Sequence, residues 1–464
     1  MVRLPPGEAE GVLHAAQAVA QAQYPGKDAG SSLGVGEMAA RSWQLLGWIS
    51  RWTTKLAFSV ADQGLSSGGH FVVNLLLVRW LPPSDYGAFA VSYSLFLILA
   101  GIHNALILEP MSIVGPGNYE RELTGYVKSS ARINAALALA LGAVLGLLCV
   151  VAHLLGSPLA SGLGGLAAAA PLLLTFWFFR RACYLRMMPR LAFESSLVYS
   201  AVLLGGLCIA WRLGWISPAA AFSWMGLGGA AASWMLRARV TQGRGVSSAG
   251  SRFPSCWAVI GEHRSYAGWF LATTASYWLA SSVYLPLIGA LAGLRAAGAY
   301  RAMESLLLPM NQTLTACGLL LLPALSREGS TRGRTCLSRA ATRISFGAAL
   351  AVAAYVLMII LLGKNLVLTL YGRAYYAEFL PLIPYLGGAL VLRAVSDTGF
   401  GTAAKAARRP EIGFWSTLSA SAVTLTAGLV LVRTHGASGA AAAWLLSAGV
   451  HAMVTVAMFR KAAR

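Results

Sequence analysis

The sequence predicts an all-α integral membrane protein with about 12 transmembrane helices in two pseudo-symmetric lobes of six. Three observations lead to this fold class. Hydrophobic residues make up 57% of the 464 residues and charged residues only 11%, whereas soluble domains carry about 25% charged residues. Apolar runs of about 20 residues, the length that crosses a bilayer, recur along the chain from residue 56 onward. Basic clusters and a repeated turn then divide these runs into two similar halves.

Twelve apolar runs are candidates for membrane spans. Glycine and alanine dominate the third and fourth, which makes these two the least secure of the twelve. In chain order the predicted spans are 56–78, 88–108, 133–155, 163–179, 191–211, 219–236, 268–291, 302–325, 346–362, 380–403, 413–432 and 439–459.

The net charge of +20 alternates along the chain instead of gathering in one segment. With the N-terminus placed inside, the cytoplasmic loops and chain ends hold 26 Lys and Arg, while the opposite loops hold 7, Arg301 among them. This alternation is the positive-inside pattern. It predicts a multi-pass protein of the cell inner membrane with both termini in the cytoplasm, and nucleic-acid binding is not needed to explain the charge. The basic loops can also attract anionic lipid headgroups.

The longest basic loop divides the predicted spans into six and six. We therefore expect a cytoplasmic N-terminal tail over 1–50, a first lobe over 51–240, a cytoplasmic inter-lobe loop over 241–264 and a second lobe over 265–464. The tail has no uninterrupted apolar core of the kind found in cleavable signals. Its polar, weakly periodic sequence favours a leader without regular structure over the alternative, a short helix after Met38 lying on the membrane.

One turn motif recurs at equivalent places in the two halves. Gly87-Ala88-Phe89 follows the first predicted span and corresponds to Gly298-Ala299-Tyr300 after the seventh, an offset of 211 residues. Ser94-Leu95 and Ser305-Leu306 keep the same offset. Prolines before one copy and a glycine before the other supply the chemistry of a tight turn. Internal repeats of this kind are common in secondary transporters.

These motifs resemble a known family. The segment Ala61–Phe89 (A-D-Q-G-L-S-S-G-G-H-F-V-V-N-L-L-L-V-R-W-L-P-P-S-D-Y-G-A-F) is similar to the opening of the polysaccharide-exporter and O-antigen flippase branch of the multidrug/oligosaccharidyl-lipid/polysaccharide (MOP) exporter superfamily. Leu370–Tyr375, Ala403–Pro410 and His435–Ala443 are similar to later pieces of that branch. The resemblance covers roughly residues 55–460. It implies two six-helix bundles around a central cavity, an architecture shared with MATE-like exporters.

For function, the resemblance implies an alternating-access flippase that moves undecaprenyl-pyrophosphate-linked oligosaccharide across the inner membrane. The product would serve cell-surface polysaccharide biosynthesis, such as the O-antigen of lipopolysaccharide. Expected partners are the lipid-linked substrate, the membrane and the polysaccharide polymerase or chain-length machinery. No cofactor, metal, nucleotide or nucleic acid is expected. One alternative is a proton- or sodium-coupled multidrug exporter of the same fold, and a less favoured one is a polytopic glycan polymerase or ligase.

No motif in the sequence indicates an enzyme. The patterns G-x-x-x-x-G-K-[ST], H-E-x-x-H and G-x-S-x-G are all missing from it. Every predicted outer loop is short and sparsely charged, which disfavours the polymerase or ligase alternative. The six cysteines lie in spans or on the predicted cytoplasmic side and form no C-x-x-C pair, which argues against disulfides and a cysteine metal site.

Asp62 is the first candidate functional residue. A carboxylate within a membrane span is costly and usually faces a water-filled cavity or a partner. Gln63, His70 and Asn74 form, with Ser67, one polar stripe along the same helix. By resemblance to the drug-efflux branch, Asp62 corresponds in position to an acid that takes the coupling proton or sodium ion. A buried structural acid is the alternative, and His70 is either a proton relay or a simple hydrogen-bonding group.

Arg393 and Asp397 form a second candidate group, four residues apart in the tenth predicted span. Arg393 could contact a substrate pyrophosphate, pair with Asp62 across the lobes as an inner gate, or simply pair with Asp397. Tyr277 in the seventh span and Asn311 in the eighth add aromatic and amide groups suited to sugars and phosphates. Hydrogen bonding between helices is the favoured interpretation for most other polar residues of these two spans.

Overall fold

The computed structural model describes residues 35–120, 122–241 and 254–463. The chain divides into two units, residues 1–54 and 55–464. In the first unit, residues 35–54 are helical and belong to α2 (Val35–Trp80). The prediction of a leader without regular structure is therefore wrong for residues 35–50, because good helix formers follow one another there without a proline. The rest of the predicted tail, residues 1–34, lies outside the described residues.

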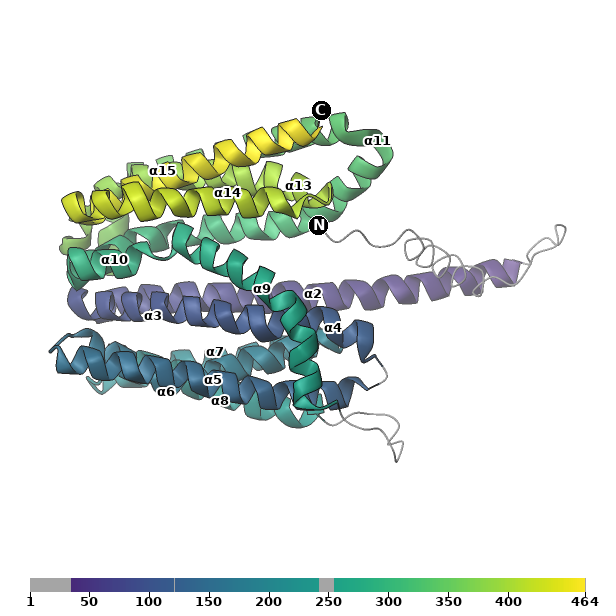
Figure 1. Ribbon diagram of the computed structural model, residues 1–464, viewed down its shortest axis with the longest axis horizontal. Coiled ribbons are helices and arrows are strands. Elements are labelled where there is room, and N and C mark those ends of the chain that lie inside the picture. Colours follow the sequence, from purple (N-terminus) through teal and green to yellow (C-terminus); the bar gives the residue numbers. More distant parts are fainter. Residues whose placement is uncertain (1–34, 121, 242–253, 464) are drawn as a thin grey trace. The chain divides into compact units, whose positions relative to one another are not determined.

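Helices make up all the regular structure described in the second unit, as the sequence predicts. Prolines at the first turn begin several of them, at a position where the missing N–H costs no hydrogen bond. In chain order the elements after α2 are α3 (Pro83–His103), η1 (Asn104–Leu108), α4 (Glu109–Asn118), α5 (Leu123–Leu154), α6 (Leu159–Leu185), α7 (Pro189–Arg212), α8 (Pro218–Thr241), α9 (Cys256–Ser281), α10 (Tyr284–Leu291), α11 (Leu294–Tyr371), η2 (Ala374–Leu382), α12 (Ile383–Arg393), η3 (Ala394–Gly401), α13 (Thr402–Ala406), α14 (Pro410–Val423), η4 (Thr424–Gly428) and α15 (Leu429–Ala463) (Figure 1).

The predicted spans all fall on these helical elements, with one short break at Ser282–Val283 inside the seventh. Among the described residues, seven helical segments are long and apolar enough to cross a membrane by length and composition. The number is smaller than twelve partly because one segment, Pro410–Ala462, contains both the eleventh and the twelfth predicted spans. The first predicted span is missing from the seven because its Asp, Gln, His and Asn lower its hydropathy.

The eighth and ninth predicted spans belong to one helix, α11, which has 78 residues. Figure 1 shows this helix curving back on itself. The Tyr371 hydroxyl, near its end, donates to the carbonyl of Ala302, near its beginning, at 2.7 Å. The Tyr355 hydroxyl donates to the carbonyl of Leu306 at 2.8 Å. The two arms of α11 therefore lie side by side and run in opposite directions, as two consecutive spans would. A similar reversal within α15 occurs at Gly436, whose φ of 58° leaves the helical region.

The helix boundaries confirm the internal repeat. The helix before the turn ends at Trp80 in the first half and at Leu291 in the second, an offset of 211 residues. The helix after the turn begins at Pro83 and at Leu294, again 211 residues apart.

The two copies of the turn also touch each other. A Cβ atom on Gly87 would lie 1.8 Å from the carbonyl oxygen of Leu294, and one on Gly298 would lie 2.7 Å from the carbonyl oxygen of Pro83. Only glycine allows the backbones of α3 and α11 to approach this closely. The repeated glycine is therefore a contact between the two halves as well as part of each turn.

Helix α9 begins at Cys256, inside the segment expected to be the inter-lobe loop. Ser255 caps this helix, because its hydroxyl accepts a hydrogen bond from the backbone N–H of Ala258 at 3.1 Å. Figure 1 shows α9 crossing obliquely from α10 towards α4 and α5. The second half thus begins with a helix that contacts the first half.

Candidate functional site

Asp62 lies on α2 with no exposed surface. Arg180 of α6 donates to one carboxylate oxygen through Nη2 at 2.7 Å and through Nε at 3.0 Å. The Tyr184 hydroxyl, one turn further along α6, donates to the same oxygen. Arg180 itself keeps about 20% of its side chain exposed. The carboxylate is therefore buried, and its hydrogen-bond partners both belong to the first half of the chain.

The predicted polar stripe of α2 follows on from Asp62. The side chains of Gln63 and Ser67 are 3.3 Å apart, and the Ser67 hydroxyl is 3.3 Å from the amide oxygen of Gln312 on α11. His70 bonds to the carbonyl of Ser66 at 2.7 Å, while Asn74 donates to the carbonyl of His70 and accepts from Tyr86. One end of the stripe therefore faces the second half of the chain, and the other end fixes α2 against α3.

His70 belongs to an aromatic group. Its ring centroid is 6.5 Å from that of Tyr199 on α7 and 6.5 Å from that of Tyr93 on α3. His70 bonds to the carbonyl of Ser66, whereas Asp62 is bonded by Arg180 and Tyr184, about two turns away along α2. A direct proton relay between His70 and Asp62 is not formed in this structure.

Arg301 was expected in an outer loop, and this expectation is wrong. It lies in the second turn of α11, only 14% exposed, with Nη1 2.7 Å from a carboxylate oxygen of Glu304. It is close enough to His70, Tyr86 and Tyr93 to interact with them electrostatically. The predicted start of the span at residue 302 missed it, because the hydrophobic signal begins after the helix does. Arg301 thus places a cation between the two halves, one turn from Gly298.

The tenth predicted span holds a second charged group. Arg393 pairs with Asp397 at 2.8 Å, as the spacing allowed, and His451 of α15 approaches the other Asp397 oxygen at 2.9 Å. The guanidinium of Arg393 lies 5.9 Å from the ring centroid of Tyr277 on α9. Asp397 keeps 44% of its side chain exposed, whereas Asp62 keeps none.

The proposed ion pair between Arg393 and Asp62 is not formed. Each residue has a partner in its own half instead, Asp397 for the first and Arg180 for the second. The structure therefore favours local pairing over a direct charge gate between the halves. Asn311 is exposed on α11, beside Gln312, and its side chain remains a candidate for binding polar ligands.

The polar residues of the seventh predicted span hold helices together less often than expected, because the hydroxyls of Thr273, Ser276 and Ser281 donate to carbonyls of their own helix. Ser276 donates to the carbonyl of Ala272, and its own carbonyl accepts from Ser421 of α14 at 2.6 Å. The Tyr284 hydroxyl bonds to Thr424 at 2.9 Å. These bonds satisfy buried polar groups and leave little for a ligand.

A bridge between α9 and the first half completes the site. His263 Nε2 lies 2.7 Å from the Tyr126 hydroxyl of α5, and its Nδ1 lies 3.1 Å from the carbonyl of Leu106. Next to it, Glu262 accepts from the Tyr119 hydroxyl at 2.9 Å. Burial, followed by this hydrogen bond, raises the pKa of Tyr119 to about 12, so its hydroxyl stays protonated. We call these four side chains, His263, Tyr126, Glu262 and Tyr119, the α9 bridge.

Sequence reasoning missed several of these partners. Arg180 and Arg301 sit at the ends of apolar runs, where a positive charge is ordinarily a loop signal, and Tyr184 lies beyond the end of the fourth predicted span. His451 lies in the last span and follows Asp397 by 54 residues, so no local spacing connects them. Its intramembrane position could have marked it, since ionisable residues are rare in spans. Among the described residues, no three His, Cys, Asp or Glu side chains gather as metal ligands would.

Comparisons with known proteins give a consistent picture of the fold. No family model and no curated protein sequence matches the chain. A lipid II flippase, MurJ, in an inward closed conformation matches with a TM-score of 0.66 at 9% identity, over 87% of this chain and 87% of that one. A MATE family multidrug transporter of the MOP superfamily matches in its inward-facing conformation with a TM-score of 0.66 at 15% identity, over 86% and 94%. An outward-facing MATE structure matches with a TM-score of 0.58 at 15% identity, over 88% and 95%.

These similarities cover 86–88% of this chain. The matching structures are transporters and flippases, not enzymes. At these low identities they establish the architecture. This chain is a multi-span membrane protein with the fold of the MOP exporter superfamily, the fold shared by MurJ and the MATE transporters.

Proposed function

We propose that this protein is an alternating-access flippase for lipid-linked oligosaccharide in the cell inner membrane, with both termini in the cytoplasm. Its substrate would be an undecaprenyl-pyrophosphate-linked sugar destined for a surface polysaccharide such as O-antigen, and a polymerase or chain-length protein would act next. The proposal is supported by the fold, by the resemblance of Ala61–Phe89 and by the positive-inside charge pattern.

Arg301 is the observation that carries the proposal. A pyrophosphate needs a cation inside the membrane, and a guanidinium matches its geometry well. Arg301 offers that cation between the two halves, with Glu304 as a counterion while substrate is away. The Asn311 and Gln63 amides, both exposed, extend the polar surface along α11 and α2.

In this transport cycle, the contact of Gly87 with Gly298 would close the outer side of the protein. It joins the halves at the end that the charge pattern assigns to the outer leaflet. The inward conformations among the matching structures have a TM-score of 0.66, against 0.58 for the outward-facing one, which supports an inward state for this chain. Separation of Gly87 from Gly298 would then open the outer side.

The two intramembrane acids would have different tasks in this cycle. We assign Asp62, sealed by Arg180 and Tyr184, to coupling, since release of either partner would let it take up a proton or sodium ion. We assign Arg393, with Asp397 and His451, to the inner gate or to contact with the substrate headgroup. Asp397 is partly exposed, and the Tyr277 ring lies beside the Arg393 guanidinium.

The test is transport by purified protein in liposomes that contain a fluorescent lipid-linked oligosaccharide. A membrane-impermeant reductant reports the fraction in the outer leaflet. Arg301→Ala should lower the rate by roughly 10- to 100-fold, the loss of one or two charge-assisted hydrogen bonds. Arg301→Lys should retain part of the activity.

Arg295→Ala is the matched control. Arg295 lies on the same helix but is exposed, and its guanidinium lies over the Tyr375 ring, 4.9 Å from the centroid, so the rate should not change. The proposal fails if the wild-type protein does not accelerate flipping. It also fails if cells depleted of the protein expose their lipid-linked sugars on the outer leaflet as before.

A proton- or sodium-coupled multidrug exporter is the second candidate. One observation favours it: the buried acid of the first helix, Asp62, occupies the position that the resemblance to the drug-efflux branch assigns to ion coupling. Drug efflux should then be lost in Asp62→Asn, and cells without the protein should be drug-sensitive with normal surface polysaccharide. The same cells should be drug-tolerant and lack surface polysaccharide if the first candidate is correct.

A further inference from the structure

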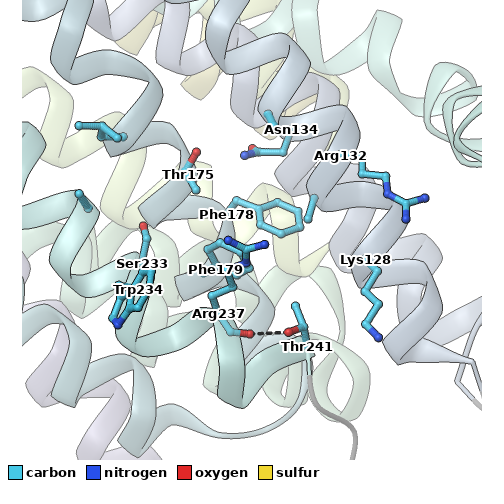
Figure 2. A pocket seen from close by; sticks show the side chains of 14 residues that line it. Lys128, Arg132, Asn134, Thr175, Phe178, Phe179, Ser233, Trp234, Arg237 and Thr241 are labelled. Carbon is cyan, nitrogen blue, oxygen red and sulfur yellow. Dashed lines mark hydrogen bonds between the residues drawn. The ribbon is translucent and has the colours of Figure 1, made fainter. Parts of the chain in front are cut away.

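A pocket of about 620 Å³ lies on the first half of the molecule, away from the residues described above. It is formed by α5, α6 and α8 alone, at the end of these helices that carries the basic loops (Figure 2). Its walls are mostly apolar and include Leu172, Phe178 and Phe179 of α6 and Trp234 of α8. Leu172 is 39% exposed and Trp234 81% exposed, so the pocket opens to the surface that faces lipid.

Three basic side chains lie at one end of this pocket. Lys128 and Arg132 come from α5, one turn apart, and Arg237 comes from α8, as Figure 2 shows. Arg132 and Arg237 are exposed. Neither guanidinium forms an ion pair or a hydrogen bond with any residue in the part of the chain that the structure describes. A basic end joined to an apolar groove matches an anion that carries a hydrocarbon chain.

A buried hydroxyl points to the same ligand. Ser233 lines the pocket with only 8% of its surface exposed, and its Oγ has no hydrogen-bond partner among the described residues. Other hydroxyls of this chain, such as that of Thr175 in the same pocket, bond to the carbonyl four residues earlier. A buried polar atom without a partner is costly, so Ser233 is suited to bond an ester or phosphate oxygen.

We propose that this groove holds an anionic phospholipid of the leaflet that borders the basic loops, with its phosphate on Arg132 and Arg237 and one acyl chain along Phe178 and Trp234. A free phosphate would leave the apolar walls without an occupant. The transported headgroup would need residues of both halves, whereas this pocket belongs to one. The lipid is therefore a bound component of the first half and separate from the transport path.

The groove and the sealed acid share helix α6. Phe178 and Phe179 line the groove, while Arg180 and Tyr184, on the other side of the same helix, bind Asp62. A lipid in the groove holds this part of α6 in place. We therefore expect the lipid to stabilise the pairing of Asp62 with Arg180.

The test is lipid binding by the full-length protein in detergent, followed by native mass spectrometry and thermal unfolding. The probes are phosphatidylglycerol, phosphatidylcholine and soluble glycerol phosphate. Phosphatidylglycerol should bind and raise the unfolding temperature, and the other two should do neither. Arg132→Gln with Arg237→Gln should weaken binding roughly 30-fold, since each cation near an anionic lipid contributes about a factor of five.

Arg190→Gln with Arg239→Gln is the matched control, because it removes the same charge from the same end of the molecule. Both residues are exposed and contact Glu194 outside the groove, so binding should not change. Ser233→Phe fills the groove without altering its charge and should abolish binding, while Ser233→Ala should weaken it only a few-fold.

Three results would overturn the proposal: equal loss of binding in the two double variants, equal binding of glycerol phosphate and phosphatidylglycerol, or normal binding to a folded Ser233→Phe protein. Undecaprenyl phosphate serves as a further probe. If it binds the groove more than 10-fold tighter than phosphatidylglycerol, the occupant is the transported class of lipid and the proposal is wrong. None of these measurements depends on transport, so they stand apart from the proposed function.

Discussion

The helices that open the two halves of the chain, α2 in the first and α9 with α10 in the second, end at corresponding residues but behave differently. Helix α2 is continuous up to Trp80 and keeps its acid, Asp62, sealed against α6 of the same half. In the second half the helix is broken at Ser282–Val283, and its first segment, α9, contacts the other half through His263.

The two repeat units share their turn but differ in what the preceding helix carries. The turn after each helix is the same, and both copies meet at one glycine contact. The position that corresponds to Asp62 by the 211-residue offset is Thr273, whose hydroxyl bonds only to its own helix. One repeat unit therefore carries a buried charge and the other carries a bridge that a conformational change would have to break.

The largest expected effect comes from removing the buried carboxylate of Asp62. Asp62→Ala leaves the Arg180 guanidinium and the Tyr184 hydroxyl without their shared acceptor, and removing one partner of a buried pair costs about 3–5 kcal/mol. The unfolding temperature of the purified protein should fall strongly. Asp62→Asn with Arg180→Gln, which removes both charges, should recover much of the loss. An Asp62→Ala protein as stable as wild type would show that the pair contributes nothing to the fold.

Next comes the contact that the two halves share. In Gly87→Ala the new methyl group would meet the Leu294 carbonyl, so the backbones of α3 and α11 must separate. We expect the distance between spin labels on these helices to increase and the transport rate to fall at least 10-fold. Gly68→Ala is the control, because nothing lies within 4 Å of a Cβ there. Identical distances in Gly87→Ala and wild type would remove the glycine contact from the mechanism.

The α9 bridge should depend on pH. His263 precedes the seventh predicted span, and burial, the largest effect, holds its pKa below the usual 6.5, while the Leu106 carbonyl and Glu262 act in the opposite direction. The bridged state thus binds fewer protons than a state with His263 in water. It is fully stable above about pH 6.5 and loses stability as the pH falls below that value.

Labels at Ala136 and Arg264, which are exposed on α5 and α9, should therefore move apart between pH 8 and pH 5. Tyr126→Phe removes one hydrogen bond of about 1 kcal/mol and should raise the pH of the transition. Glu262→Gln tests whether the neighbouring carboxylate contributes to the pH dependence. If it abolishes the pH dependence and His263→Gln does not, the sensor is Glu262.

The smallest effect is expected where the polar stripe of α2 meets α11. The Ser67 hydroxyl and the Gln312 amide are 3.3 Å apart and exposed, so Ser67→Ala should cost about 0.5 kcal/mol or less. Thermal unfolding measures this, with Thr273→Ala, which removes a hydroxyl that bonds to its own helix, as a comparison in the second half. A loss of more than about 2 kcal/mol in Ser67→Ala would mean that this contact locks the halves together.

Much of the architecture could be predicted from local signals. The helices, the 211-residue repeat and the pairing of Arg393 with Asp397 follow from hydropathy, turn residues and a spacing of one helical turn. The polar stripe of α2 follows from the same periodicity. The partners of Asp62 could not be predicted, because Arg180 is 118 residues away and looked like part of a basic loop. The burial of Arg301 was missed because the hydrophobic run begins after this residue, whereas the helix begins before it.

By itself, the sequence determined that the chain crosses a membrane many times, where its spans lie and that its halves are related, because each of these depends on neighbouring residues. Only the tertiary structure decided that Asp62 is sealed by α6, that Arg301 faces the other half, and that α9 leaves its own half to contact Tyr126. These facts depend on which faces of distant helices meet. Hydropathy shows that a helix is buried in lipid or protein, but the identity of its neighbours is set by packing across the whole fold.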